Sequence, residues 1–271
     1  MGSVLAEFLK LSRRPAVLVL TTLAIISVAV LIYGLLYVSV RTSASDGQQS
    51  AQQLAEARQR LYPASFLWTV LSNFGDLYYA LALILGGLAF GSEYGWATWK
   101  TVLTQGPGRT QVFVAKLAVV TMTVMAWVVA MFAVAAASSS AAALLDGAQM
   151  RWPQAGEILS AMGSALLILL MWVSLGAVLA VVFRQAALAL GLGLTYATLE
   201  LVLAGTLSHG QGGGALVHSL PGFNAVALAH AFAPGRGASQ IGPGQAALVI
   251  AVYCSVFAVT AALLVRNRDV T

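Results

Sequence analysis

Long apolar stretches alternate with short polar segments along the whole chain. An apolar run of about 18 residues or more is long enough to cross the hydrocarbon core of a bilayer as a helix. Strands of a membrane barrel would instead alternate apolar and polar residues at every second position, whereas the runs here are continuous. We therefore expect an all-α membrane protein with six transmembrane helices, at about residues 16–40, 66–91, 117–143, 158–183, 186–205 and 245–265.

The composition agrees with this class. Of the 271 residues, 59% are hydrophobic and 8% are charged, whereas charged residues make up about 25% of a soluble domain. A soluble protein of this size would need far more polar surface to cover its core. The polar segments leave no room for a separate soluble domain, so we expect residues 1–271 to form a single transmembrane domain.

The basic residues lie at the ends of the apolar runs rather than in one patch, which argues against nucleic-acid binding and indicates a membrane topology. If the N-terminus is cytoplasmic, nine of the 14 Lys and Arg residues fall inside and five outside. The positive-inside rule then predicts a multi-pass protein with both termini in the cytoplasm. The first run is about 25 residues long, beyond the roughly 7–15 apolar residues of a signal peptide, so we expect a retained anchor.

A short amphipathic segment precedes the first span. Apolar Phe8 and Leu11 are interleaved with basic Lys10, Arg13 and Arg14. This combination is typical of a helix that lies on the inner membrane surface. We therefore expect an N-terminal elbow helix there.

The most informative polar segment joins the second span to the third. Trp96, Trp99 and Leu103 are spaced to share one side of a helix, and the glycine–proline–glycine sequence at 106–108 would end it. The pattern predicts a short amphipathic helix at about 93–105 on the cytoplasmic face. Two interpretations are open: an ordinary interfacial helix with its tryptophans at headgroup level, or a docking element for a cytoplasmic partner.

This segment resembles the ABC-2 type permeases, the membrane subunits of ATP-binding-cassette exporters. The resemblance lies in a glycine and a glutamate after the second span, a small amphipathic helix, a Gly/Pro turn and two basic residues. The family often has Gly-Thr where this chain has Ala97-Thr98. The tight turn at 183–185 and the stretch 221–232 are also similar to the family, which has short outer helices before the sixth span. The residues that carry the resemblance are Gly91, Glu93, Gly95, Thr98, Lys100, Leu103, Thr104, Gly106, Pro107, Arg109 and Lys116.

The resemblance implies a permease subunit of an ATP-driven exporter in the bacterial plasma membrane, with a hydrophobic or amphipathic cargo such as a drug, an antibiotic, a lipid or a peptide. A second permease copy, expected to be identical, would complete a dimer with two ABC ATPase subunits that hold ATP and Mg²⁺. The chain itself is not expected to be an enzyme or to bind a cofactor, because it contains no G-x-x-x-x-G-K-[ST] phosphate loop. The residues expected to dock the ATPase are Glu93, Trp96, Trp99, Lys100, Leu103 and Arg109.

Two carboxylates fall within the predicted spans, where a charge is costly and is by default a functional hypothesis. Asp76 is three residues from both Asn73 and Tyr79, which predicts one shared face of the second span, and Glu200 lies toward the outer end of the fifth. These four residues are candidates for a substrate path. A structural role through hydrogen bonds across helices is the equally weighted alternative. A short helix is also expected within the polar outer stretch 48–61.

Other function classes fit the sequence less well. No predicted span contains a histidine, and no G-x-S-x-G occurs, which disfavours an intramembrane enzyme. A stand-alone secondary transporter would carry inverted repeats and broken helices, and neither is visible in the sequence. His209, His218 and His230 share one outer loop, but their spacing matches no metal-binding pattern, so no metal site is expected.

Overall fold

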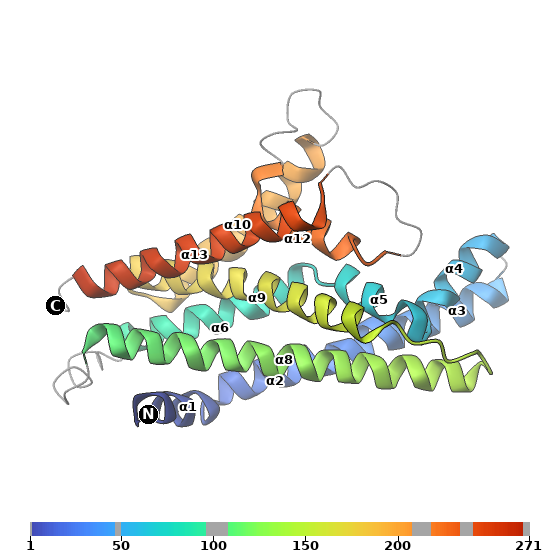
Figure 1. The fold of residues 1–271 in the computed structure, drawn as a ribbon, viewed down its shortest axis with the longest axis horizontal. Helices are drawn as coiled ribbons and strands as arrows, with labels where there is room; N and C mark the ends of the chain where they lie inside the picture. The colour runs from blue at the N-terminus through green and yellow to red at the C-terminus, as the bar shows by residue number, and fades with distance from the viewer. Residues whose placement is uncertain (1, 47–49, 96–107, 208–217, 234–240, 268–271) are drawn as a thin grey trace.

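The computed structural model describes residues 2–46, 50–95, 108–207, 218–233 and 241–267, and all regular structure within these ranges is helical. Figure 1 shows the long helices lying side by side along the longest axis of the molecule, with α8 and α9 running in opposite directions. The chain is therefore a helical bundle, as the continuous apolar runs predict.

The first span is one long helix that follows a short N-terminal helix, α1 (Gly2–Ser12). It begins with α2 (Pro15–Ser27), where the fixed backbone angle of Pro15 suits the first turn of a helix. It continues through a π-helical segment, η1 (Val28–Gly34), into α3 (Leu35–Asp46). A π-helical stretch inside an α-helix is rare and is frequently found at functional sites.

The second predicted span is broken into two helices. α5 covers Phe66–Ser72 and follows a 3-10 turn, η2 (Pro63–Ser65), whereas α6 covers Asp76–Gly95. The two parts are bent by 59° at the break. The helix expected over 66–91 is therefore interrupted, and the reason is local: residues 73–75 include an asparagine and a glycine, both weak helix formers.

The remaining helices complete the bundle. The short helix expected within 48–61 is confirmed as α4 (Ala51–Leu61), and Ser50 and Gln53 form a capping box at its start. Most of the stretch 221–232 forms another short helix, α12 (Pro221–His230). The other helices are α8 (Arg109–Leu145), α9 (Ala155–Phe183), α10 (Ala186–Leu207) and α13 (Pro243–Asn267).

Four helices of the described chain are long and apolar enough to cross a membrane, or five if the bent pair counts as one span. They contain the first, third, fourth and sixth predicted spans, and the bent pair contains the second. The fifth predicted span falls in α10, whose apolar part counted in the described chain is shorter, Ala186–Glu200. The structure thus supports four or five spans, and the span predicted in α10 stays a prediction.

The core of the bundle is the contact between α6 and α9. A Cβ atom added to Gly86 of α6 would lie 2.1 Å from the Val173 carbonyl oxygen, and one added to Gly176 of α9 would lie 2.2 Å from that of Leu83. Small residues let helices approach this closely in lipid. Figure 1 shows α6 and α9 between α8 on one side and α10 and α13 on the other.

Candidate coupling site and substrate path

The predicted docking segment starts at the end of α6 and finishes before α8. Glu93 lies in the last turn of α6 and Arg109 is the first residue of α8, but neither side chain is among those described. Four further predicted docking residues lie outside the described residues: Trp96, Trp99, Lys100 and Leu103. The docking helix at 93–105 therefore stays a prediction, and the structure provides the packing of its two flanking helices.

The end of α6 is held by the start of the first span. Arg14, at the N-cap of α2, donates hydrogen bonds from Nη1 to the Leu88 carbonyl oxygen at 3.1 Å and to Ser92 Oγ at 2.7 Å. Because a guanidinium is a planar group with several fixed donors, these bonds orient the last turns of α6 against the α1–α2 connection. Arg13, the neighbouring arginine of the predicted elbow, is exposed.

The start of α8 is held by α1 through a buried ion pair. Lys116 Nζ lies 2.8 Å from Glu7 Oε2, and 4% and 13% of the two side chains are exposed. Lys10 Nζ lies 3.8 Å from the other oxygen of this carboxylate. Beside the pair, the ring of Phe90 in α6 packs against Phe113 in α8, with centroids 5.2 Å apart. A buried ion needs its partner, since removal of either one leaves an uncompensated charge.

Glu7, Arg14, Ser92 and Lys116 together form what we call the N-terminal clamp. The clamp joins α1 and α2 to both helices that flank residues 96–107. The first span and the helix before it thus contact α6 and α8 at the same end of the bundle. Within α1, the amphipathic pattern is visible in the packing, because Leu11 is buried and Phe8 is 46% exposed; how this helix lies relative to the membrane surface stays a prediction.

Sequence reasoning missed two members of the clamp, Glu7 and Ser92. The signal for Glu7 is Lys116, a cation inside the apolar helix α8, which requires a counter-charge. The carboxylate that supplies it is 109 residues away, and nothing in the sequence selects it. Ser92 carries no signal, because a serine near a helix end has many possible roles.

A cavity of about 290 Å³ lies beside the break between α5 and α6. Asn73, a predicted substrate-path residue, borders it and donates from Nδ2 to the Thr69 carbonyl oxygen at 2.8 Å. Irregular backbone at membrane depth occurs where it is buried or lines a cavity, and both the break and η1 border this one. The lining residues are Leu31, Ile32, Leu35, Leu36, Ser39, Arg60, Thr69, Ser72 and Asn73.

The helix is interrupted between Asn73 and Asp76, so Asn73 does not share the expected face with Asp76 and Tyr79. Asp76 is the first residue of α6, and its side chain is outside the description. Tyr79 is buried and stacks on Trp172 of α9, with ring centroids 4.9 Å apart and 18° between the planes. Tyr79 therefore belongs to the packed core, whereas Asn73 borders the cavity.

Glu200 is buried, with 3% of the residue exposed, and its carboxylate caps a helix. Its Oε1 accepts hydrogen bonds from the backbone N–H groups of Gly222 and Phe223 at the start of α12. A carboxylate in this position satisfies free N–H groups and interacts favourably with the helix dipole. Glycine permits the approach, because a Cβ atom on Gly222 would lie 2.9 Å from Glu200 Oε1. The contact is of the structural kind that was the alternative to a substrate role.

An aromatic chain connects two of the four predicted path residues. The Trp172 ring that stacks on Tyr79 also lies 6.4 Å from the ring of Tyr196, one helical turn before Glu200. The structure thus links Tyr79 with Glu200 through two rings, and Asn73 lies in a different environment, beside the α5–α6 break.

The clamp, the broken span and the aromatic chain lie within one region that is similar to known proteins. A family model described as "ABC-2 family transporter protein" matches residues 3–200, more than half of the chain. The chain belongs to the ABC-2 transporter family. The match begins in α1 and ends at Glu200 in α10, so α12 and α13 lie beyond it. A comparison with curated proteins found no match.

An ABC-2 family permease is a membrane subunit without an ATPase site of its own, which agrees with the lack of a phosphate loop in this sequence. Two of the three histidines of this permease pack against aromatic rings: the ring of His218 stacks on that of Phe223 with centroids 5.7 Å apart, and the ring of His230 meets that of Trp68 at 4.8 Å. His209 lies outside the described residues. Across the part of the chain that the structure describes, no group of three or more His, Cys, Asp or Glu is placed to hold a metal ion.

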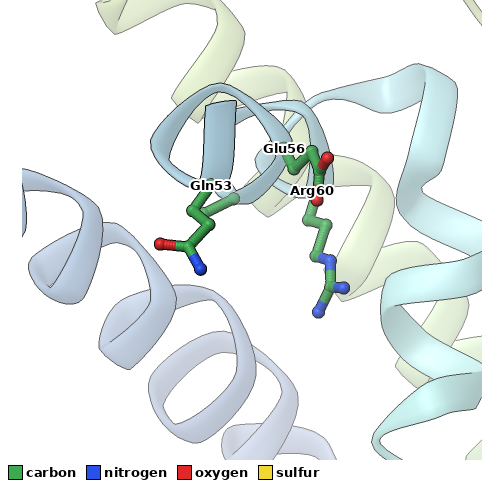
Figure 2. A pocket seen from close by; sticks show the side chains of 4 residues that line it. Gln53, Glu56 and Arg60 are labelled. Atoms are coloured by element: carbon green, nitrogen blue, oxygen red, sulfur yellow. The ribbon is translucent and has the colours of Figure 1, made fainter. Parts of the chain in front are cut away.

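A hollow of about 300 Å³ lies along α4, at the opposite end of this ABC-2 permease from the clamp. Figure 2 shows Gln53, Glu56 and Arg60 extending from α4 around it. These residues are spaced by three and four positions, so they share one face of a single helix. Binding pockets usually gather polar groups from several elements, and this hollow has no such convergence.

Proposed function

We propose that this protein is the membrane-spanning permease subunit of an ATP-driven ABC exporter. Two identical copies form the transport path, and each docks one ABC ATPase subunit through the segment at 93–105. ATP and Mg²⁺ bind to the ATPase pair. The complex lies in the bacterial plasma membrane, with both permease termini in the cytoplasm, and moves a hydrophobic or amphipathic cargo outward by alternating access.

The N-terminal clamp is the observation that carries this proposal. It ties the two helices that flank the docking segment to the first span, through Arg14 on α6 and through the Glu7–Lys116 pair on α8. Protein interiors are close-packed and transmit displacements. A push from the ATPase therefore moves the inner ends of three helices together, which is the motion that alternating access requires.

The cavity beside the α5–α6 break supports an amphipathic cargo. Leu31 and Leu35 provide an apolar wall, and Arg60, Asn73 and Ser39 provide polar groups. Small-molecule sites are mostly apolar, with a few polar groups that fix orientation. A drug, an antibiotic, a lipid or a short peptide each offers an apolar body with a polar end that matches this lining.

Co-purification with an ATPase tests the proposal. The tagged permease is expressed with an ATPase encoded beside it, and we expect a complex of about equal stoichiometry with vanadate-sensitive ATP hydrolysis. The double change Trp96→Ala and Trp99→Ala should release the ATPase. Trp152→Ala is the matched control, because it removes a tryptophan that is 48% exposed and lies beyond the far end of α8. A complex that survives the double change contradicts the docking role, and a permease that purifies alone contradicts the proposal.

One observation favours a second candidate, a stand-alone secondary transporter. Broken helices mark the binding sites of many such transporters, and the α5–α6 pair is a broken helix. Proteoliposomes that contain this chain alone separate the two candidates. Cargo movement driven by an ion gradient, without ATPase or ATP, would establish the alternative.

A further inference from the structure

An apolar groove of about 350 Å³ lies between α1, α2 and α8. Figure 1 shows α1 and the start of α2 beside the first half of α8. Three large side chains of its wall, Phe8, Leu18 and Met122, are 46%, 56% and 54% exposed. The groove is thus open along its length to whatever surrounds the bundle.

The polar groups that line the groove are already bonded within the protein. The hydroxyls of Ser12, Thr21 and Thr123 each donate to a backbone carbonyl of their own helix, at 3.2, 2.8 and 2.9 Å. Trp127 donates from Nε1 to Thr21 Oγ1 at 2.8 Å. These donors are therefore not available to bind a polar occupant of the groove. The lining is suited to a flexible apolar chain.

The position of the groove selects the occupant. Its α2 wall is made by the first two turns of a spanning helix, so the groove opens to lipid acyl chains. The α1–α2 connection borders the groove at Ser12 and carries the exposed cation Arg13 as the next residue. Basic positions between membrane helices at the cytoplasmic side attract anionic lipid headgroups. Apolar lining and charge together match a lipid with a negative headgroup.

We propose that this groove binds one anionic phospholipid, with an acyl chain along α8 and the headgroup phosphate at Arg13. The lipid fills the space between α1 and the bundle. Because α1 also carries Glu7 of the N-terminal clamp, the bound lipid helps to hold α1 in the position that the clamp requires. The site is independent of the proposed ATPase, since it requires only the membrane.

Native mass spectrometry of the full-length chain tests this site. The purified protein in detergent is titrated with palmitoyl-oleoyl phosphatidylglycerol or with phosphatidylcholine of the same chains. We expect one phosphatidylglycerol to be retained at concentrations where phosphatidylcholine is lost. Arg13→Gln should weaken phosphatidylglycerol binding about fivefold, the factor that corresponds to about 1 kcal/mol per basic residue at an anionic surface. Ala126→Phe, in the groove lining, should abolish retention of the lipid.

Two matched variants serve as controls. Arg58→Gln removes an exposed arginine of α4 at the other end of the molecule, and Ala133→Phe adds the same ring to an exposed alanine of α8 outside the lining. Both should retain lipid as the unchanged chain does. Equal retention in Ala126→Phe overturns the groove, and equal binding of the two lipids overturns the anionic headgroup. If Ala126→Phe changes the oligomeric state and leaves the lipid count unchanged, the occupant is a second copy and the proposal fails.

Discussion

The two ends of the bundle are held by charged contacts of nearly equal length and very different exposure. At the α1 end, Lys116 and Glu7 pair at 2.8 Å with 4% and 13% of their side chains exposed. At the α4 end, Arg41 and Asp146 pair at 2.9 Å with 57% and 19% exposed. Distance alone would rank the two pairs as equals.

The α4-end pair belongs to a group that we call the distal cluster: Arg41, Asp146, Tyr37 and Tyr62. Arg41 donates to Tyr37 at 2.8 Å, and Tyr62 donates to the second oxygen of Asp146 at 3.2 Å. Water competes for the exposed guanidinium of Arg41, and exposed ion pairs contribute little to stability. The comparison shows that exposure decides whether a contact fixes one arrangement, as in the clamp, or permits several.

The largest effect should follow from Lys116→Met. This change removes the closer of the two cations beside the Glu7 carboxylate and leaves Lys10 at 3.8 Å. Loss of one partner from a buried pair costs about 3–5 kcal/mol, and the remaining Lys10 contact places the expected loss toward the lower end of this range. Thermal unfolding of the purified chain measures the loss. The double change Glu7→Leu and Lys116→Met should recover most of it, because no buried charge is then left over. Equal unfolding temperatures for the single and double variants would show that the pair does not hold α1 in place.

Arg14→Gln should have the next largest effect, and on coupling more than on assembly. The change removes two hydrogen bonds from a charged donor to α6, and each bond of this kind contributes about 1.5–3 kcal/mol. If the proposed function is right, ATPase recovery in the complex should persist while cargo-stimulated ATP hydrolysis falls. Arg58→Gln is the matched control, because it removes an exposed arginine of α4, at the other end of the molecule from the clamp. Similar rates of cargo-stimulated ATP hydrolysis in the two variants would show that Arg14 has no role in coupling.

The two ends also differ in how far the sequence predicts them. Continuous apolar runs locate the long helices, because a helix in lipid must satisfy its own backbone. The same runs hide the α5–α6 break, since the apolar residues on both sides of residues 72–76 make the whole stretch resemble one continuous span. The sequence likewise places Lys116 beside a span and gives no means of choosing Glu7. The role of Glu200 as a helix cap depends on Gly222, which the fold brings close. The sequence separation of the two residues does not predict this contact.

Asp146→Asn should have a small effect, which sharpens the contrast between the ends. Arg41 keeps its bond to Tyr37 and gains water, so the loss of the charge pair is largely compensated. We expect a fall in unfolding temperature that is roughly fivefold smaller than for Lys116→Met. Comparable losses for the two variants would mean that the distal cluster is as protected from water as the clamp.

The smallest effect concerns the pH response of the distal cluster. Burial raises the pKa of Tyr62 above its ordinary value, and the charge of Asp146 raises that pKa further. The unfolded phenol therefore ionises first, so the contribution of Tyr62 to stability is fully present below about pH 10 and is lost as the pH rises through the folded pKa. Unfolding temperatures between about pH 8 and pH 11 should decline less for Tyr62→Phe than for the unchanged chain. Because the Asp146 charge contributes to the shift, Asp146→Asn should also flatten the decline, and to a lesser extent, since burial is the larger cause. An identical decline of the unfolding temperature in all three proteins would show that the Tyr62 phenol is not protected from water. The distal cluster would then be as hydrated as its exposed arginine.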